Sequence, residues 1–223
     1  MREYPQFTVF AGPMASGKTT ALHNLIGEFE ATHTSFEVYK PRLEIRNIGL
    51  QPRGISDNDA RECKVVESLE EINSNELVAN GIGRILLEEF MMFGYTIERK
   101  ENNLDLAKLL LKWGEDGITH VYAAGLDLAA SGNTFPLFKQ AHEIGAKVVL
   151  FESKCEYPNG QENPTCRKPA RNTQIFSRSL NKAYRRESLP DLLPEGDDPD
   201  RGYRAVCMAH FLLQDEFTID FGN

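Results

Sequence analysis

Hydrophobic and polar residues follow one another along the chain in two kinds of segment. Short apolar runs bounded by turn residues predict buried strands, and they occupy residues 7–10, 36–41, 62–69, 83–89, 120–127 and 146–153. Longer segments repeat apolar residues every three or four positions, which predicts helices over residues 19–30, 104–117 and 136–145. Strands that alternate with helices predict an α/β fold, in which a parallel sheet has helices on both faces.

A glycine-rich loop joins the first predicted strand to the first predicted helix. Its sequence, GPMASGKT at residues 12–19, satisfies the pattern G-x-x-x-x-G-K-[ST]. In such a phosphate loop, backbone N–H groups surround a polyphosphate, Lys18 reaches the outer phosphates and the Thr19 hydroxyl ligates Mg²⁺. Because a helix N-terminus attracts anions, the order strand, loop, helix favours nucleotide binding over a turn without a ligand.

Two adjacent carboxylates, Glu88 and Glu89, follow the apolar run RILL. Phosphoryl transfer needs a metal-holding acid and a carboxylate that orients or deprotonates the attacking hydroxyl. One of the two could face Mg²⁺ and the other the acceptor. A charged pair at a strand end is otherwise solvated surface, and the phosphate loop makes the catalytic interpretation the preferred one.

The composition changes near residue 153, after which prolines, charges and turn residues dominate. We therefore predict a nucleotide-binding kinase domain at residues 1–152 and a smaller subdomain at residues 153–223. Since the second segment cannot bury much of a core, a metal or a ligand is expected to hold it together. The candidate ligands are Cys155, Cys166, Cys207 and His210, a set suited to structural Zn²⁺, with unligated buried thiols as the alternative. Cys63 is interpreted as a small core residue.

Length and charge limit the class of protein. The 223 residues are 41% hydrophobic with a net charge of −8, and no apolar run reaches the ~20 residues of a membrane span. The N-terminal residues lack the pattern of a signal peptide, so a cytoplasmic protein is expected. The acidic balance argues against nucleic acid as a partner. Basic residues do outnumber acidic ones over residues 152–187, where a solvated face or a phosphate-facing rim is preferred to a nucleic-acid contact.

Six motifs in order, from residue 12 to residue 210, resemble the zinc-containing type II thymidine kinases. GPMASGKT is close to G-P-M-[FYN]-S-G-K-[ST], KPRLEIR follows K-P-x-x-D-x-R, and LEEFMMF is similar to D-E-[AG]-Q-F. GLDLAASGNTF parallels G-L-D-x-x-F-[RQ]-x-x-x-F, CRKPARNTQ is near C-G-K-P-A-x-x-T-Q, and DRGYRAVCMAH fits D-x-Y-x-x-x-C-x-x-[CH]. The resemblance covers nearly the whole chain.

This resemblance implies transfer of the γ-phosphate of ATP to the 5′-hydroxyl of thymidine or a related pyrimidine deoxynucleoside. Glu89 is then the base, Lys18 and Arg46 act on the transferring phosphate, and Thr19 with Glu88 holds Mg²⁺. The donor-binding residues are Gly12, Pro13, Met14, Ala15, Ser16, Gly17, Lys18, Thr19 and Glu88. The acceptor-binding residues are Met14, Glu89, Leu126, Phe135, Thr173 and Tyr203. A zinc-anchored lasso loop that ends near Tyr203 and a homotetramer are implied in the same way.

The chain departs from this family's pattern at several positions. Glu88 stands in place of Asp, Met91 in place of Gln, and Ala130 in place of an aromatic residue. An aromatic-to-alanine change removes a large contact. Either Phe90, Met91 and Met92 fill the gap and restore a thymidine pocket, or the vacancy admits a larger 5-substituent. We favour the second outcome, in which 5-substituted deoxyuridines are phosphorylated at least as well as thymidine. The alternative functions are a kinase for another small hydroxyl-bearing acceptor, and a catalytically silent nucleotide-binding protein kept for assembly or for nucleic-acid contact.

Overall fold

The computed structural model describes residues 4–44, 61–93, 104–158, 166–186, 189–190 and 198–212. The chain divides into two compact units. Unit 1 comprises residues 1–11, 17–125 and 136–149, and unit 2 comprises residues 12–16, 126–135 and 150–223. The division into domains at residues 152 and 153 stays a prediction.

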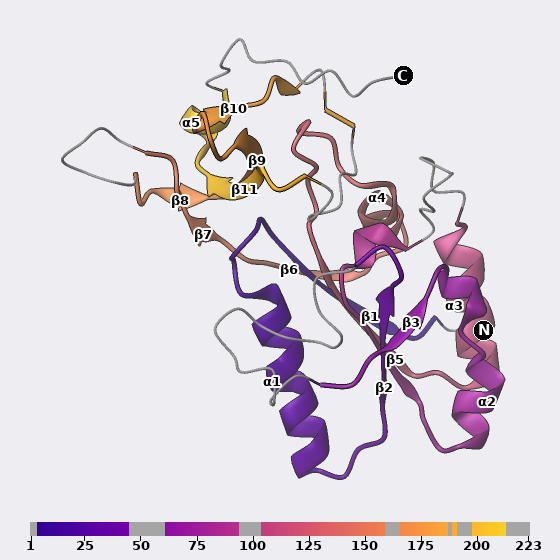
Figure 1. Ribbon diagram of the computed structural model, residues 1–223. Coiled ribbons are helices and arrows are strands. Elements are labelled where there is room, and N and C mark those ends of the chain that lie inside the picture. The colour runs from indigo at the N-terminus through magenta and orange to yellow at the C-terminus, as the bar shows by residue number, and fades with distance from the viewer. Residues whose placement is uncertain are drawn as a thin grey trace. The chain divides into compact units, whose positions relative to one another are not determined.

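A six-stranded sheet in the order β3-β2-β4-β5-β1-β6 organises the first part of the chain (Figure 1). The pairings β2–β3, β2–β4, β4–β5 and β1–β5 are all parallel. The strands are β1 (Gln6–Ala11), β2 (Glu37–Pro41), β3 (Lys64–Val66), β4 (Arg84–Leu87), β5 (His120–Gly125) and β6 (Lys147–Leu150). The parallel sheet with its helices confirms the predicted α/β class.

Helix α1 (Lys18–Ala31) covers one face of this sheet. Its Leu22 and Ile26 form a buried cluster with Val38 of β2, Leu86 of β4 and Ala124 of β5. The two helical residues are four apart and therefore lie on one side of the helix. Cys63, just before β3, is half-buried and packs against the same cluster, close to its predicted core role.

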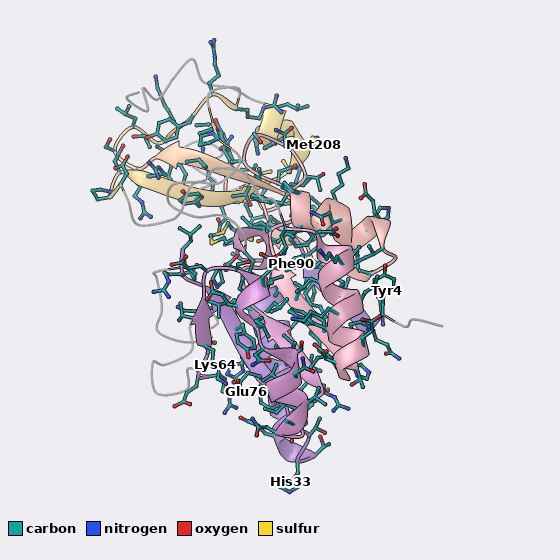
Figure 2. All side chains as sticks on the ribbon, turned by 90° about the vertical axis from the view of Figure 1, so that its right-hand side faces the viewer. Tyr4, His33, Lys64, Glu76, Phe90 and Met208 are labelled. Carbon is teal, nitrogen blue, oxygen red and sulfur yellow. The ribbon has the colours of Figure 1, made fainter. Side chains whose placement is uncertain are left out.

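The opposite face is covered by helices from later in the chain, α3 (Leu106–Asp116) and α4 (Pro136–Glu143). Phe7 and Phe10 of β1 are three positions apart, so they point to opposite faces of the sheet. Phe10 packs toward α1, whereas the ring of Phe7 lies 5.7 Å from that of Phe90, which in turn lies 5.5 Å from Phe138 of α4. Phe90 is fully buried among these side chains (Figure 2).

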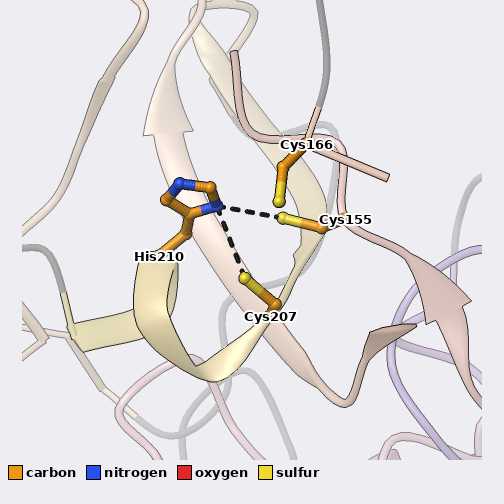
Figure 3. A group of neighbouring side chains, drawn as sticks. All are labelled: Cys155, Cys166, Cys207 and His210. Atoms are coloured by element: carbon orange, nitrogen blue, oxygen red, sulfur yellow. Dashed lines mark hydrogen bonds between the residues drawn. The ribbon is translucent and has the colours of Figure 1, made fainter. Parts of the chain in front are cut away.

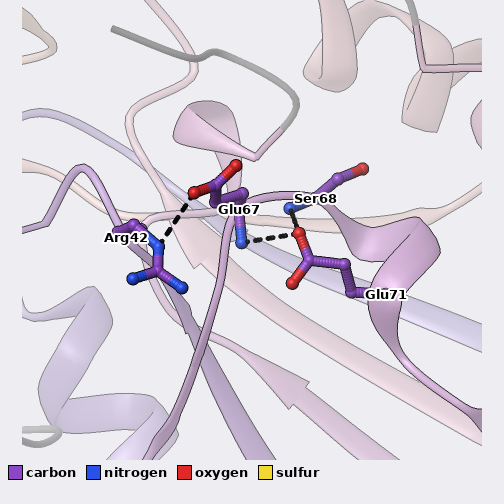
Figure 4. Close-up of polar contacts among 4 residues, drawn as sticks. All are labelled: Arg42, Glu67, Ser68 and Glu71. Carbon is purple, nitrogen blue, oxygen red and sulfur yellow. Dashed lines mark hydrogen bonds and ion pairs between the residues drawn. The ribbon is translucent and has the colours of Figure 1, made fainter.

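Local capping fixes where several of these elements begin and end. The Asp105 side chain accepts a hydrogen bond from the Lys108 N–H at the start of α3, and Gly117 ends the helix with a left-handed φ of 110°. A short 3-10 helix at Leu69–Glu71 starts with a capping box, in which a Glu71 carboxylate oxygen accepts from the Ser68 N–H (Figure 4). These caps satisfy N–H and C=O groups that a helix end leaves unpaired.

Unit 2 is built on a three-stranded antiparallel sheet in the order β10-β9-β11 and a two-stranded one, β7-β8. Its elements are β7 (Ser153–Lys154), β8 (Pro169–Ala170), β9 (Asn172–Ser177), β10 (Lys182–Ala183), β11 (Arg201–Val206) and α5 (Met208–Leu212). Five of the six residues of β9 are buried. The strand therefore forms the core of this unit.

In unit 1 the predicted helices and strands agree with the structure within a few residues, whereas strands β8 to β11 and the two short 3-10 helices were not predicted. Residues 146–153 were expected as one strand, but β6 ends at Leu150 and a separate strand, β7, begins at Ser153. Helix α2 (Ser74–Ala79) was not expected, because its six residues are too few to establish a helical period. Over the described ranges, no helix is long and apolar enough to cross a membrane.

Candidate functional site

Four side chains that the sequence singled out as metal ligands gather in unit 2. The ligand atoms of Cys155, Cys166, Cys207 and His210 all lie within 4.8 Å of one another (Figure 3). Nδ1 of His210 is 3.3 Å from Sγ of Cys155 and 3.5 Å from Sγ of Cys207. We call these four residues the metal cluster. It could hold a metal ion such as zinc, because three thiolates and an imidazole are the soft donors of tetrahedral zinc sites.

The chain brings these ligands together through a tight turn and a short helix. Cys155 follows β7 and donates its N–H to the Lys168 carbonyl at 2.8 Å, while the Arg167 N–H donates to the Cys155 carbonyl at 2.9 Å. Cys207 follows β11, and His210 lies three residues further on in α5, where the Phe211 N–H donates back to the Cys207 carbonyl. The Cys-x-x-His spacing therefore becomes one helical turn.

The surroundings shift the pKa values of three of the four side chains in the cluster, in different directions. Burial raises the pKa of the Cys155 thiol. Burial acts on Cys207 in the same direction, but hydrogen bonds from the His210 backbone and from the Cys155 and Cys166 side chains outweigh it and lower the pKa of that thiol. Burial, helped by the charges of Lys168 and Arg204, lowers the pKa of His210. A metal ligand must be a neutral imidazole, and these surroundings favour that form.

A stack of planar groups supports the histidine ligand. The His210 ring lies 4.3 Å from the Tyr157 ring at an interplanar angle of 14°. The Arg204 guanidinium lies over two aromatic rings: its central carbon is 4.5 Å from the centre of the Tyr157 ring and 4.4 Å from the centre of the Phe176 ring. The sequence pattern carried no signal for this stack, since its members are separated by up to 53 positions in the chain (157 to 210). Only the folded sheet brings them together.

The first residues of the phosphate loop, Gly12–Ser16, belong to unit 2 and are held closely there. A Cβ at Gly12 would lie 2.5 Å from the Phe151 carbonyl oxygen, so only glycine fits. The Met14 N–H donates to Oγ1 of Thr173 at 3.2 Å, and the Ser153 hydroxyl donates to the Ala15 carbonyl at 3.2 Å. Sequence reasoning gave Thr173 a role but missed Ser153.

The loop continues into unit 1 at Gly17, which precedes α1. Gly17 has a left-handed φ of 92°, and no side chain caps the helix N-terminus there. Lys18, the first residue of α1, is buried, and Thr19 is half-buried. A helix N-terminus whose N–H groups lack a side-chain cap is suited to an anion.

Charge is buried in unit 1 at the carboxyl ends of its strands. Among the described residues of this unit, the buried charged side chains are Lys18, Lys40, Glu44 and Glu88. The Glu88 N–H donates to the Tyr39 carbonyl, which places Glu88 beside Lys40 at the ends of the paired strands β4 and β2. Nζ of Lys40 donates to the Glu44 carbonyl at 3.2 Å. Sequence reasoning found Glu88 but gave Lys40 no role.

Glu89, the predicted base, has an unusual backbone. Its φ of 47° and ψ of 48° are left-handed, and it precedes the 3-10 helix Phe90–Met92. Non-glycine residues in this conformation are strained and are concentrated at functional sites. Met91, which replaces the family's glutamine, lies against Gly125, because a Cβ on that glycine would be 3.0 Å from the methionine sulfur.

The predicted acceptor residues other than Glu89 all lie in unit 2. Thr173 pairs with Ala205, and Tyr203 pairs with Ile175, so these two predicted residues share one face of the antiparallel sheet. Phe135 is buried and Leu126 half-buried in the segment before α4. Arg46 lies outside the described residues.

Ala130, where the family has an aromatic residue, is buried rather than beside an open space. It packs in a cluster with Ile175, Tyr184 and Leu189. Within unit 2, other side chains therefore take up the volume next to this alanine. Arg171, which carried no prediction, joins two segments of the unit: its guanidinium donates to the Phe151 carbonyl at 2.6 Å and to the Asp127 carboxylate at 2.9 Å.

No known protein-family model matches the chain. The assignment to the type II thymidine kinases therefore stays a proposal that depends on the residues described above.

Proposed function

We propose that this chain is a nucleoside kinase of the type II thymidine kinase family. It transfers the γ-phosphate of ATP to the 5′-hydroxyl of thymidine or a related, 5-substituted pyrimidine deoxynucleoside. The observation that carries the proposal is the burial of Lys18, Lys40, Glu44 and Glu88 in unit 1. Burying a charged side chain costs free energy unless it pairs with another charge or binds a ligand. These four side chains adjoin the carboxyl ends of parallel strands, which is where α/β proteins bind ligands.

The donor nucleotide is proposed to bind along residues 12–19. The backbone N–H groups of the loop and of the first turn of α1 would meet the β- and γ-phosphates, and the Lys18 ammonium would contact their outer oxygens. The Thr19 hydroxyl and the Glu88 carboxylate are the hard oxygen ligands that Mg²⁺ prefers. When bound, Mg²⁺ would neutralise phosphate charge, a task that Arg46 is proposed to share by resemblance.

Glu89 is proposed as the base of the reaction. Its carboxylate would accept the proton of the 5′-hydroxyl as the oxygen bonds to the γ-phosphorus, and the bond to ADP breaks. Thr173, Leu126, Phe135, Tyr203 and Met14 are proposed to surround the acceptor. The Thr173 hydroxyl oxygen accepts a hydrogen bond from the Met14 N–H at 3.2 Å. Its O–H group is still able to donate, and we propose that it donates to the pyrimidine.

The metal cluster is proposed to hold a structural Zn²⁺ that anchors the lasso subdomain. Its donors fit this ion, because tetrahedral coordination at about 2.3 Å places sulfur atoms less than 4 Å apart, and the ligand atoms here lie within 4.8 Å of one another. All four positions are protein side chains, as in structural sites. The zinc takes no part in the proposed reaction.

The same resemblance supports a cytoplasmic homotetramer whose partners are a nucleoside and ATP rather than nucleic acid or a membrane. The mass of the particle in solution by light scattering tests the assembly. A homotetramer would have four times the 25.2 kDa mass of one chain.

The decisive experiment supplies purified protein with Mg-ATP and a panel of nucleosides, and measures ADP and nucleoside 5′-monophosphate. We expect ADP release that depends on thymidine and on 5-substituted deoxyuridines, with little release when the nucleoside is omitted. Mg-ATP binding without turnover of any nucleoside would favour the silent nucleotide-binding alternative. Turnover of an unrelated hydroxyl compound alone would favour the other kinase alternative.

A further inference from the structure

Two residues of the phosphate loop, Met14 and Ala15, are hydrogen-bonded to side chains of β7 and β9 in the same unit as the metal cluster. The Ser153 hydroxyl of β7 donates to the Ala15 carbonyl, and Oγ1 of Thr173 in β9 accepts from the Met14 N–H, both at 3.2 Å. All four residues belong to unit 2. Two of the loop's residues are therefore held by side chains of β7 and β9.

Ala15 is the residue most in need of such support. Its φ of 54° lies in the left-handed region, which a residue with a Cβ holds only when its surroundings impose it. Ser153 binds the carbonyl group of Ala15 itself. The hydrogen bond therefore acts directly on the strained peptide and fixes the direction of the next N–H groups in the loop.

Both anchoring residues lie close to candidate metal ligands, along the chain or across the sheet. Ser153 lies two residues before Cys155, and Thr173 pairs across the sheet with Ala205, which lies two residues before Cys207. Strands β7 and β8 pair at Ser153–Ala170 and Lys154–Pro169, and backbone hydrogen bonds from Cys155 to Lys168 and from Arg167 to Cys155 continue the pair. An isolated two-stranded hairpin is marginally stable at best, so a metal that joins Cys155 to the other candidate ligands would strengthen this pair.

We propose that Ser153 and Thr173 are positioning residues for the phosphate loop, and that metal occupancy of the cluster controls nucleotide affinity through them. The proposal rests on the proposed function, because it requires residues 12–19 to bind a nucleotide. Loss of the metal would release β7 from β8 and Ser153 from Ala15. The loop would then have to be ordered by the nucleotide, at a cost to its affinity.

Calorimetric titration with Mg-ATP, in the absence of any nucleoside, tests this directly. Zinc-loaded Ser153→Ala should bind Mg-ATP about three- to tenfold more weakly than wild type, because the variant loses one hydrogen bond and its net contribution to affinity. Ser153→Thr, which keeps a hydroxyl, should restore much of the affinity. The matched control is Thr32→Ala, which removes a hydroxyl hydrogen bond to the Glu28 carbonyl at the last turn of α1; its affinity should equal that of wild type.

Zinc removal, followed by buffer exchange and addition of Mg-ATP, provides the second arm. Metal-depleted wild type should bind Mg-ATP at least as weakly as zinc-loaded Ser153→Ala. Depletion should weaken Ser153→Ala by a smaller factor, because its anchor is already lost. Equal affinities of loaded wild type and Ser153→Ala, or the same depletion factor in both, would overturn the proposal. If loaded wild type fails to bind Mg-ATP, the proposed function itself fails.

Discussion

At the scale of single residues, three of the five described non-glycine residues with a left-handed backbone lie at the candidate sites. Glu89, Ala15 and Arg167 have left-handed φ values of 47°, 54° and 59°. The first is the proposed base, the second lies in the phosphate loop, and the third follows the ligand Cys166. Such conformations cost free energy and persist where surrounding contacts fix them. Glu89 and Arg167 each give a test, the first of function and the second of stability.

Replacement of Glu89 by glutamine should abolish transfer while Mg-ATP still binds. The amide keeps the shape of the side chain but cannot accept the hydroxyl proton, and loss of a positioned base costs about 10²- to 10⁴-fold in rate. Turnover of thymidine and calorimetric Mg-ATP affinity are the two measurements. Glu70→Gln, an exposed change in the same unit, is the control. More than a tenth of wild-type turnover in Glu89→Gln would pass the role to Glu88.

Replacement of Arg167 by glycine should stabilise the zinc-loaded protein by about 1 kcal/mol, because glycine holds a left-handed conformation without strain. The backbone hydrogen bond from residue 167 to the Cys155 carbonyl is kept. His33→Gly is the matched control, with a φ of 51° at the exposed end of α1 (Figure 2), and should give a similar gain. Free energies of unfolding from denaturant titration measure both. A loss of stability in Arg167→Gly would mean that its side chain contributes more than the strain costs.

At the scale of helices and strands, the sequence specified most of unit 1 and less of unit 2. Helix α3 was predictable at both ends because its apolar period, its Asp105 cap and its Gly117 stop all agree. The 3-10 turn Phe90–Met92 was not, since three apolar residues after two glutamates show no period. In unit 2, the pairs β7–β8 and β9–β11 join strands that lie far apart in the chain, and β7 and β8 have only two residues each. Local patterns carry no signal for such pairs.

Two glycine-to-alanine changes in helices of unit 1 should act in opposite directions. Gly27 lies within α1, and nothing lies within 4 Å of a Cβ there, so Gly27→Ala should stabilise the protein by about 1 kcal/mol. Gly117→Ala should destabilise it by about 1–2 kcal/mol, because its φ of 110° is left-handed and the new Cβ would meet the Val78 side chain at 3.1 Å. Thermal and denaturant unfolding of both variants measure the difference. Shifts of the same sign would contradict this account of the two sites.

At the scale of the whole molecule, the candidate sites contain some residues that the sequence predicts and others that only the folded chain brings together. The four candidate metal ligands were predictable because their chemistry is carried by residue type and spacing, and the structure brings all four together. Three other contributions were not predictable, because each depends on which strands become neighbours: those of Ser153, of Lys40 and of the ring stack on His210. Their residue types are ordinary at the surface of any protein. The fold alone gives them partners within hydrogen-bond or ring-contact distance.

The two units should also differ in what stabilises them. The hydrophobic cluster around the metal ligands consists of Cys155, Ala170, Ala205, Val206, Cys207 and Phe211. Most of these side chains are small, so their burial contributes little free energy. Unit 1, in contrast, buries Trp113, Phe90, Phe93 and several leucines completely. Metal binding is then expected to supply folding free energy to unit 2 that its own core does not.

We therefore expect about one Zn²⁺ per chain in protein purified without chelator, and a local effect when a ligand is lost. Cys207→Ser should increase amide hydrogen exchange in β9, β11 and α5, while β1, β4 and β5 keep their protection. Cys63→Ser is the matched control, because that thiol is half-buried outside the metal cluster, and it should retain the zinc and the exchange pattern of unit 2. Metal analysis together with exchange measured by mass spectrometry gives both readouts. Wild-type protein purified without zinc would contradict the proposed metal site. Equal loss of protection in both units of Cys207→Ser would mean that the two units unfold together.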